Sequence, residues 1–346
     1  MIIIFGPTGV GKTDLAEQLA AQLPSEIINA DLGQFYTPFS IGTAKPDWRN
    51  SPVVQHLFDS INEPQMISVT EYRDQVTQKL EEIWNRNSTP IIVGGSGFYI
   101  QSLFFPPVSA TVDHFQKNYY GSEEDRWKLL YSIDPDRALR IHHNDVYRIN
   151  RALDIYYSTG KKPSEQIPRY QPLGSFCFIS INRDREDLYG RINQRAQLML
   201  NAGWLAEVAR LQGTSWEPFL KKKKLIGYDD ILKYLEGSKT KDDYAELIEH
   251  ITRKTRNYAK RQITFGNQLF DRLEKALLEN SDGRSRCLRI NLTSAKLELY
   301  INQLLPQIGL MGPGQVRLDP SSQPSLLRSY GGQAGRLIPS MDEGSE

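Results

Sequence analysis

Cysteine is scarce in this sequence. Cys177 and Cys287 are the two cysteines in 346 residues, and they lie far apart. Two such residues cannot build the disulfide framework of a small secreted domain or a cysteine-rich zinc site. The scarcity is typical of a reducing compartment, and we therefore expect a cytoplasmic protein.

Long apolar runs and an excess of charge are also missing. No stretch approaches the ~20 apolar residues that a membrane helix needs, and the N-terminus shows no signal-peptide pattern. The net charge is +1, from 42 basic and 41 acidic residues, so any attraction for a polyanion must come from a local basic surface. The length is enough for about two domains with their own cores. We expect a chain without membrane contact.

Short apolar runs alternate with longer amphipathic segments. The runs resemble strands and occupy residues 1–5, 26–30, 90–94 and 176–181. The longer segments resemble helices and occupy residues 14–23, 70–85 and 185–211. Strands that alternate with helices form parallel sheets with helices on both faces. The pattern predicts an α/β fold built on a parallel sheet flanked by helices.

A glycine-rich loop joins the first expected strand to the first expected helix. It reads "GPTGVGKT" and fits G-x-x-x-x-G-K-[ST] in the strand–loop–helix context that this motif requires. Backbone N–H groups and the helix N-terminus bind phosphate there, and the last hydroxyl can bind Mg²⁺. The phosphate-binding residues predicted by the motif are Gly6, Pro7, Thr8, Gly9, Val10, Gly11, Lys12 and Thr13. By itself the motif indicates nucleotide binding, with ATP or GTP hydrolysis or kinase chemistry.

The pattern changes in the middle and at the end of the chain. Residues 106–169 hold no convincing strand and are rich in charged and aromatic side chains, which predicts a helical insertion with its best helix over 141–158. The core then consists of residues 1–105 and 170–305, and a long helix is expected over 242–278. Residues 312–346 are rich in Gly, Pro and Ser, so we expect a disordered tail there.

Two polar positions follow expected strands and are candidates for the site. Asp31 would lie at the carboxyl edge of the sheet beside the phosphate loop, where a carboxylate binds Mg²⁺ or accepts a proton; an Asp that caps a turn is the alternative. Ser96 lies in the second glycine turn, "VGGSGFYI", which lacks a lysine and can also be a simple tight turn.

Basic residues gather in three runs despite the neutral composition. The runs are "VYRINRALDIYY" at 146–157, four lysines at 221–224, and "ITRKTRNYAKRQ" at 251–262. One run alone is usually a solvated face, but three together favour a groove for a polyanion. Arg191 and Arg195 form a further pair at helical spacing and could clamp a diphosphate.

Taken in order, these blocks resemble the tRNA dimethylallyltransferase family. The resemblance runs from about Ile2 to Phe265 and rests on "GPTGVGKT", "NADLGQFY", "IGTAKP", "VGGSGFYI", "RIHHND", "LIGY" and "AKRQITF". It implies a P-loop NTPase-like core with a helical insertion, and a monomeric enzyme.

The resemblance also implies a specific reaction and specific roles. The loop would hold the diphosphate of dimethylallyl diphosphate, and the prenyl group would pass to N6 of the adenosine 3′ of the anticodon, position 37. Asp31 would be the general base, Thr13 would bind Mg²⁺, and Arg195, with Arg191 as second choice, would stabilise the departing diphosphate. The partners would be dimethylallyl diphosphate and the anticodon stem-loop of tRNA.

A set of residues is expected to face tRNA, from the resemblance and from the basic patterning together. They are Asp31, Leu32, Gly33, Gln34, Ser96, Tyr147, Arg148, Ile149, Asn150, Arg151, Lys224, Gly227, Tyr228, Arg253, Arg256, Lys260, Arg261 and Gln262. The sequence departs from the family where Leu32-Gly33 replace the usual Ser after the catalytic Asp, and where the usual Trp-Phe-Arg is missing after "AKRQIT".

Three other functions fit parts of the pattern. A nucleotide or small-molecule kinase would use the same loop but would leave the basic runs unexplained. An adenine-nucleotide prenyltransferase would share the chemistry and would not need RNA-facing helices. A tRNA-binding protein without catalysis is the third alternative, because "DLGQ" is altered.

Overall fold

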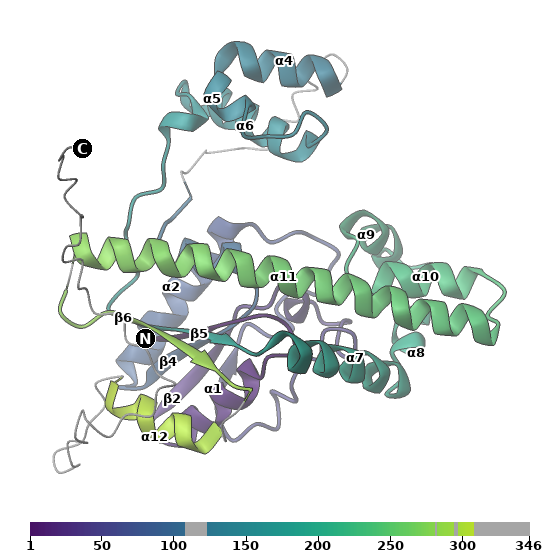
Figure 1. Cartoon of the computed structure of the whole chain (residues 1–346), viewed down its shortest axis with the longest axis horizontal. Coiled ribbons are helices and arrows are strands. Elements are labelled where there is room, and N and C mark those ends of the chain that lie inside the picture. Colours follow the sequence, from purple (N-terminus) through teal and green to yellow (C-terminus); the bar gives the residue numbers. More distant parts are fainter. Residues whose placement is uncertain (108–122, 281, 294–296, 308–346) are drawn as a thin grey trace, which may run out of the picture.

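A six-stranded parallel sheet forms the centre of the computed structural model, which describes residues 1–107, 123–280, 282–293 and 297–307. The strand order is β3-β2-β4-β1-β5-β6, as Figure 1 shows in part. The strands are β1 (Ile2–Phe5), β2 (Ser25–Asn29), β3 (Gln55–His56), β4 (Thr89–Gly94), β5 (Cys177–Asn182) and β6 (Arg286–Asn291). The α/β prediction is confirmed.

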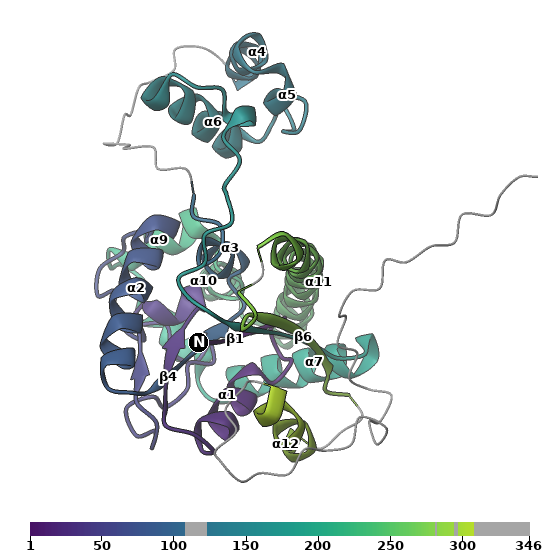
Figure 2. The same cartoon turned by 90° about the vertical axis from the view of Figure 1, so that its left-hand side faces the viewer.

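Side chains alternate between the two faces of the sheet because successive residues of a strand point to opposite sides. In β1, Ile2 and Ile4 pack with α1 (Lys12–Ala20) and α12 (Leu297–Gln307), whereas Ile3 and Phe5 join the cluster on the other face. That second face is covered by α2 (Val69–Asn85), α3 (Gly97–Ser102) and α11 (Lys241–Glu279), and Figure 2 shows the helices on both sides. The central strand is buried on both faces, as its continuous apolar run requires.

The helix predicted over 185–211 is two helices. α7 (Arg185–Asn201) is followed by α8 (Trp204–Ala209), and Gly203 between them has φ 102°, in the left-handed region that ends a helix. Two more helices follow, α9 (Trp216–Lys223) and α10 (Tyr228–Glu236). The break turns the chain, so that α10 packs against α11 while α8 and α9 pack against α10.

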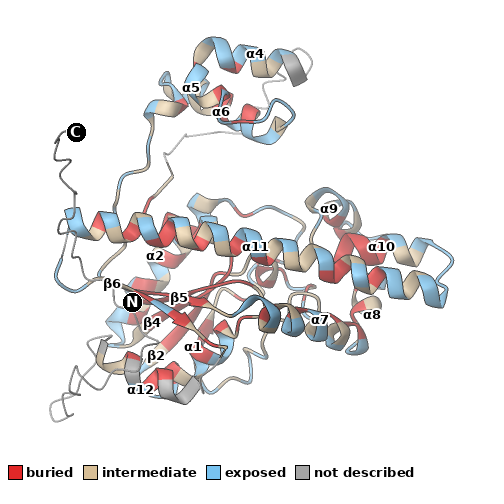
Figure 3. Ribbon diagram, viewed as in Figure 1, coloured by how far each residue is buried: buried red, intermediate tan, exposed pale blue. Residues whose placement is uncertain are grey.

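Helix α11 crosses the whole core with 39 residues. Thr240 begins it with a capping box, in which its hydroxyl accepts a hydrogen bond from the backbone N–H of Asp243. A stripe that includes Leu247, Ile251 and Leu269 is buried against the sheet and α10, and Figure 3 shows this stripe in red. The helix predicted over 242–278 is confirmed.

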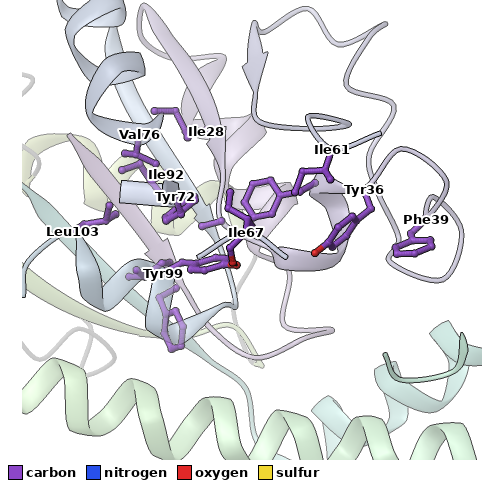
Figure 4. Packing of buried hydrophobic residues seen from close by; sticks show 14 of the residues in the cluster. Ile28, Tyr36, Phe39, Ile61, Ile67, Tyr72, Val76, Ile92, Tyr99 and Leu103 are labelled. Atoms are coloured by element: carbon purple, nitrogen blue, oxygen red, sulfur yellow. The ribbon is translucent and has the colours of Figure 1, made fainter. Parts of the chain in front are cut away.

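An aromatic cluster supports the carboxyl end of β2, as Figure 4 shows. The rings of Tyr72 and Tyr99 stack with centroids 4.6 Å apart, and Phe35 packs against both. The buried Tyr72 hydroxyl donates to the Asn29 carbonyl oxygen (3.3 Å). The segment that carries Asp31 is therefore packed against buried aromatic side chains of α2 and α3.

The insertion is a small helical unit set apart from the core. It contains α4 (Glu123–Ile133), α5 (Pro135–Ala138), α6 (Val146–Thr159) and the short 3₁₀ helix η2 (Pro163–Glu165). Its described core is small and consists of Leu130, Ala138, Ile141, Ile149, Ala152 and Leu153. In Figure 1 the unit lies beyond α11, on the side away from the sheet.

Two linkers join the insertion to the core and run side by side. The backbone N–H groups of Gln171 and Leu173 donate to the carbonyl oxygens of Phe104 (2.7 Å) and Leu103 (3.1 Å). Arg272 of α11 donates to the Pro168 carbonyl (2.8 Å). The insertion is thus anchored at its base by backbone pairing and a side chain of α11.

Two strands have no counterpart in the sequence prediction. β3 has two residues, Gln55 and His56, and β6 is an edge strand with arginines at two of its six positions. Neither shows an apolar run, because edge strands are only partly covered. The tail expected over 312–346 lies outside the described residues. Within the described ranges, no helix combines the length and apolarity needed to cross a membrane.

Candidate active site

The phosphate loop joins β1 to the N-terminus of α1 at the carboxyl edge of the sheet. Gly11 is the N-cap of α1 and has φ 102°, a left-handed conformation that side chains other than glycine adopt at a cost. The conformation turns the chain into the helix immediately before Lys12. The loop therefore leads directly into a helix N-terminus, the arrangement in which the motif predicts phosphate binding.

Lys12 is a buried cation in this loop. Its residue is 8% exposed, and its Nζ donates to the Pro7 carbonyl oxygen (3.1 Å). Burial lowers the pKa of Lys12, and the carboxylate of Asp31 partly opposes that effect. The ammonium is held in place before any substrate arrives.

Helix α7 adds two guanidinium groups to the loop. Arg195 donates from Nη1 to the Thr8 hydroxyl (3.2 Å), and Arg191 donates from Nε to the Gly9 carbonyl oxygen (2.9 Å). Burial lowers the pKa of Arg195, and Asp31 again opposes it. The structure brings both candidate arginines to the phosphate loop, with Arg195 the more buried of the two.

Asp31 lies directly after β2 with a fixed carboxylate. The backbone N–H of Gly95 donates to its Oδ1 (2.9 Å), and its Oδ2 lies 4.0 Å from Lys12 Nζ. Its own N–H donates to the Asn29 side-chain oxygen (2.8 Å). Its side chain is 32% exposed, so one oxygen is anchored while the group stays accessible.

Gln262 connects these parts, and the sequence interpretation missed this role. Its Oε1 accepts from the Thr8 N–H (2.9 Å), and its Nε2 donates to the Gly95 carbonyl oxygen (2.8 Å). The residue is 4% exposed. The side chain of Gln262 joins the phosphate loop to the turn that holds Asp31, and its expected contact with tRNA stays a prediction. Nothing in a basic helical run distinguishes such a glutamine from a solvated one.

The residues after Asp31 form the 3₁₀ helix η1 (Leu32–Phe35). The Leu32 N–H donates to the Ser96 hydroxyl (2.9 Å), which ties η1 to the second glycine turn. Gly33 is partly exposed. Gln34 is buried and donates from Nε2 to the carbonyl oxygens of Thr43 (3.1 Å) and Ala44 (3.3 Å).

A narrow cavity lies between α1 and the β2 side of the sheet. Its lining includes Lys12, Thr13 and Asp31, together with Gln34 and the apolar Phe58. Gln34 therefore belongs to the inner wall of the site, and its expected contact with tRNA stays a prediction.

The "IGTAKP" loop is anchored by Glu207 of α8, a residue for which the sequence gives no signal. Its carboxylate accepts from the N–H groups of Ser40 (3.0 Å), Ile41 (2.7 Å) and Gly42 (3.2 Å). Lys45 of this loop forms an ion pair with Asp59 rather than entering the site. A carboxylate that accepts three backbone N–H groups fixes a loop strongly.

The "LIGY" block lies largely in the interior. Tyr228 is 0% exposed and donates its hydroxyl to Glu207 (2.7 Å), and burial raises its pKa. Gly227 has φ 84°, and a Cβ there would lie 2.0 Å from the Trp204 ring. Gly227 and Tyr228 are buried, whereas Lys224 is exposed; the expected contacts of these residues with tRNA stay predictions.

The basic run of α11 divides between structural and exposed positions. Arg256 donates to Asn193 of α7 (2.8 Å) and to Glu249 (3.1 Å), and Lys254 pairs with Asp230 of α10 (2.6 Å). Arg253, Lys260 and Arg261 are exposed. Arg253, Lys260 and Arg261 remain candidates for contact with the phosphate backbone of RNA. Arg256 instead joins α11 to α7 through Asn193.

Helix α6 of the insertion carries the other basic run. Tyr147 is 79% exposed, and Arg148 and Arg151 are also exposed. Ile149 is buried in the small core of the insertion, and its expected contact with tRNA stays a prediction. Asn150 is half-buried, and its Oδ1 has no hydrogen-bond partner among the described residues.

The residues present fit a magnesium ion bound together with a diphosphate. Thr13, the second residue of α1, is exposed and directly follows Lys12. Across the described ranges, no three His, Cys, Asp or Glu side chains gather into a metal site. Mg²⁺ commonly takes one or two protein oxygens and completes its shell with substrate phosphates and water, which suits this arrangement.

Comparison with known proteins places the chain among relatives of similar length. A family model described as IPP transferase matches residues 34–268. A tRNA dimethylallyltransferase from Petrotoga mobilis is 33% identical over 316 residues, which cover 89% of this chain and 98% of the relative.

Solved structures agree with the sequence relatives. A crystal structure of a tRNA delta(2)-isopentenylpyrophosphate transferase from Staphylococcus epidermidis has a TM-score of 0.59 at 26% identity, covering 90% of this chain and 99% of that one. A structure of a eukaryotic dimethylallyltransferase acting on tRNA has a TM-score of 0.71 at 26% identity, covering 91% of this chain and 81% of that one. The chain belongs to the IPP transferase family.

Proposed function

We propose that this protein transfers the dimethylallyl group of dimethylallyl diphosphate to N6 of adenosine 37 in tRNA and releases diphosphate. The observation that carries the proposal is the 4.0 Å separation of Lys12 Nζ and Asp31 Oδ2, which puts an anion site and a base in one pocket. Family membership supports it, since the relatives are named tRNA dimethylallyltransferases. A phosphate loop alone would equally suit a kinase.

The phosphate loop stabilises the leaving group. As the allylic C–O bond breaks, its electron pair moves onto the diphosphate, and the carbon skeleton becomes a delocalised cation. Lys12, Arg191 and Arg195 already surround the loop with fixed positive charge, so little reorganisation is needed during the reaction. Mg²⁺, held by Thr13, would supply further charge neutralisation on the phosphate oxygens.

Asp31 accepts the proton that N6 loses. The amine nitrogen bonds to the allylic carbon and becomes acidic as it gains positive charge, so an ordinary carboxylate is a sufficient base. The Gly95 N–H anchors one oxygen of Asp31, which leaves the other toward the pocket. The anchoring sets the direction of proton transfer.

Two exposed basic regions serve RNA recognition. One is on α6, with Arg148 and Arg151 beside Tyr147, and the other is on α11, with Arg253, Lys260 and Arg261. Arginine and lysine contact phosphates without reading sequence, and they position an RNA on the protein. The target base must then leave its stack to reach Asp31.

The test is incubation with labelled dimethylallyl diphosphate, Mg²⁺ and unmodified tRNA, followed by mass analysis of the nucleosides. A dimethylallyl adenosine in the tRNA digest is the expected result. Parallel reactions with AMP in place of tRNA, and with ATP in place of the prenyl donor, distinguish the alternatives. Prenylation of AMP with no product in tRNA, or phosphoryl transfer from ATP, would overturn the proposal.

A further inference from the structure

Phe98 is an exposed aromatic side chain at the edge of the active site. It lies in the first turn of α3 and is 63% exposed. Its ring contacts the Phe265 ring edge to face, with centroids 5.1 Å apart and an angle of 66°. Phe265 in turn packs against Phe5 of the central strand (6.5 Å). The exposed ring is thus fixed against the core although most of it faces solvent.

The surroundings of Phe98 are those of the reaction. Gly95, three residues earlier, holds the Asp31 carboxylate, and Ser96, two residues earlier, holds the Leu32 N–H. Phe265 lies one helical turn after Gln262, which joins Gly95 to the phosphate loop. The two rings therefore belong to the two segments, residues 95–98 and 262–265, that hold the base and join it to the phosphate loop, and we call these two segments the rim of the site.

Positive charge lies close to this rim. Lys260 and Arg261 are exposed on α11, about one turn before Phe265. An exposed aromatic ring next to exposed cations is the combination that binds single-stranded nucleic acid, because each base has a face to stack and each nucleotide has a phosphate. An apolar protein partner would not require the cations.

We infer that Phe98 stacks on the unpaired nucleobase that neighbours the target adenosine. The inference rests on the proposed function, because it assumes an RNA with one base turned into the pocket. Turning that base out removes a stacking partner from its neighbour, and an aromatic ring at the rim replaces it. Phe98 is then a positioning residue. It keeps the anticodon loop of the RNA in its opened conformation while Asp31 and the phosphate loop carry out the reaction.

The test compares Phe98→Ala and Phe98→Trp with the wild type on an anticodon stem-loop RNA. Loss of one stacked base contact corresponds to about a 5- to 150-fold change in affinity. We expect Phe98→Ala to lower kcat/KM for the RNA within that range and to leave KM for dimethylallyl diphosphate and the salt dependence unchanged, because stacking involves no ionic contact. Phe98→Trp should retain activity.

A second substrate isolates the stacking contact. In an RNA that carries an abasic nucleotide on either side of the target adenosine, the ring has no base to stack on at that position. With one of the two abasic RNAs, the Phe98→Ala enzyme and the wild type should then have the same kcat/KM. The loss caused by the substitution and the loss caused by the abasic nucleotide are therefore not additive. Leu278→Ala is the matched control, since Leu278 is 76% exposed at the far end of α11.

Three results would overturn the inference. The first is a Phe98→Ala enzyme with wild-type kcat/KM for RNA, and the second is an equal loss on both abasic RNAs and on the intact one. The third is a wild-type dimer in light scattering that Phe98→Ala converts to a monomer, since a second copy would then cover the ring. If the wild type forms no prenylated product, the proposed function fails separately, and RNA affinities of the same variants still test the stacking.

Discussion

The catalytic pocket and the insertion differ in how their functional side chains are held. In the pocket, Lys12 and Gln262 are less than a tenth exposed, and Asp31 is anchored by a backbone N–H. In the insertion, Tyr147 and Arg148 project from a helix that rests on a small core. One region fixes its groups through buried hydrogen bonds, and the other displays them.

The difference follows from what each region is proposed to do. Bond breaking at the diphosphate gains from charges that are oriented beforehand in a poorly solvated site. Recognition of a large polyanion gains from exposed cations that can reach several phosphates, and it tolerates imprecise geometry. Substitutions in the pocket should therefore affect turnover and the prenyl donor, whereas substitutions on the insertion should affect tRNA binding.

The largest effect is expected at Asp31. Asp31→Asn keeps the shape and the hydrogen bond from Gly95 but removes the base, so turnover should fall by about 100-fold or more. Binding of tRNA and of the diphosphate should be nearly unchanged. Single-turnover kinetics with labelled donor measure the chemical step, and filter binding measures the affinity for tRNA.

Asp47→Asn is the matched control for this substitution, because Asp47 is exposed and accepts a hydrogen bond from Asn50 on the surface. It should behave as wild type. An Asp31→Asn enzyme with normal turnover would place the base on another residue.

The next largest effect is expected at Gln262. Gln262→Leu leaves the Thr8 N–H and the Gly95 carbonyl oxygen without partners, and a buried unpaired group costs about 1–3 kcal/mol. KM for dimethylallyl diphosphate should rise by about tenfold or more, while KM for tRNA changes less. Steady-state kinetics with each substrate varied in turn provide the measurement.

Gln268→Leu is the control on the same helix, because Gln268 is exposed. If Gln262→Leu instead raised KM for tRNA alone, the residue would contact RNA, as the sequence interpretation predicts. The pocket would then also bind tRNA, which contradicts the proposed division of roles between the two regions.

The two exposed basic regions can be compared directly. Replacing Arg148 and Arg151 by Ala on α6, or Arg253 and Lys260 by Ala on α11, removes two cations from each region. If both regions contact phosphates, each double variant should raise KM for tRNA several-fold and lower the slope of log affinity against log salt by about 1.5 to 2. Affinities for tRNA at four or more salt concentrations give the slopes.

An unchanged slope for one double variant would remove that region from the RNA-binding surface. An effect on KM for dimethylallyl diphosphate in either case would show that the two regions are not separable as argued.

The smallest effect on activity is expected at Asp134 of the insertion. Asp134 is 1% exposed and accepts from the N–H groups of Arg137 (3.0 Å) and Ser164 (2.7 Å). Asp134→Ala should destabilise α5 and its contact with η2 by about 1–2 kcal/mol. Amide exchange should then be faster within residues 123–165 and unchanged in the sheet. Faster exchange in β1 and β4 would show that the two regions unfold together.

Asp134 also predicts a dependence on pH. Burial raises the pKa of Asp134, but the hydrogen bonds from Ser164 and Arg137 outweigh burial and lower the pKa below the ordinary value of 3.8. A lowered pKa stabilises the folded insertion above that ordinary value, and the contribution is lost as the pH falls through the folded pKa. Asp134→Ala should remove the part of the insertion's stability that is lost in acid. Amide exchange of the variant and the wild type at pH 5 and pH 3 measures this difference.

Local sequence patterns predicted the elements that carry a motif or a periodic apolar pattern of their own. The run at residues 1–5, the loop that ends in Thr13 and the amphipathic stripe of α11 each carry their own signal, because period and composition follow from burial on one or two faces. The edge strand β6 and the break at Gly203 were missed. The apolar content of β6 depends on which elements cover it, and the break at Gly203 depends on a left-handed backbone conformation.

The sequence by itself determined that a phosphate loop opens the chain, that Asp31 follows a strand and that basic residues gather in three runs. Only the tertiary structure decided that Gln262 bridges the loop to the turn beside Asp31, that Glu207 anchors the "IGTAKP" loop, and that Tyr228 is buried. The reason is physical. A glutamine or a glutamate pairs with whichever backbone groups the fold brings within about 3 Å. The groups that Gln262 and Glu207 bind come from segments more than a hundred residues away, whereas the buried Tyr228 pairs with the side chain of Glu207.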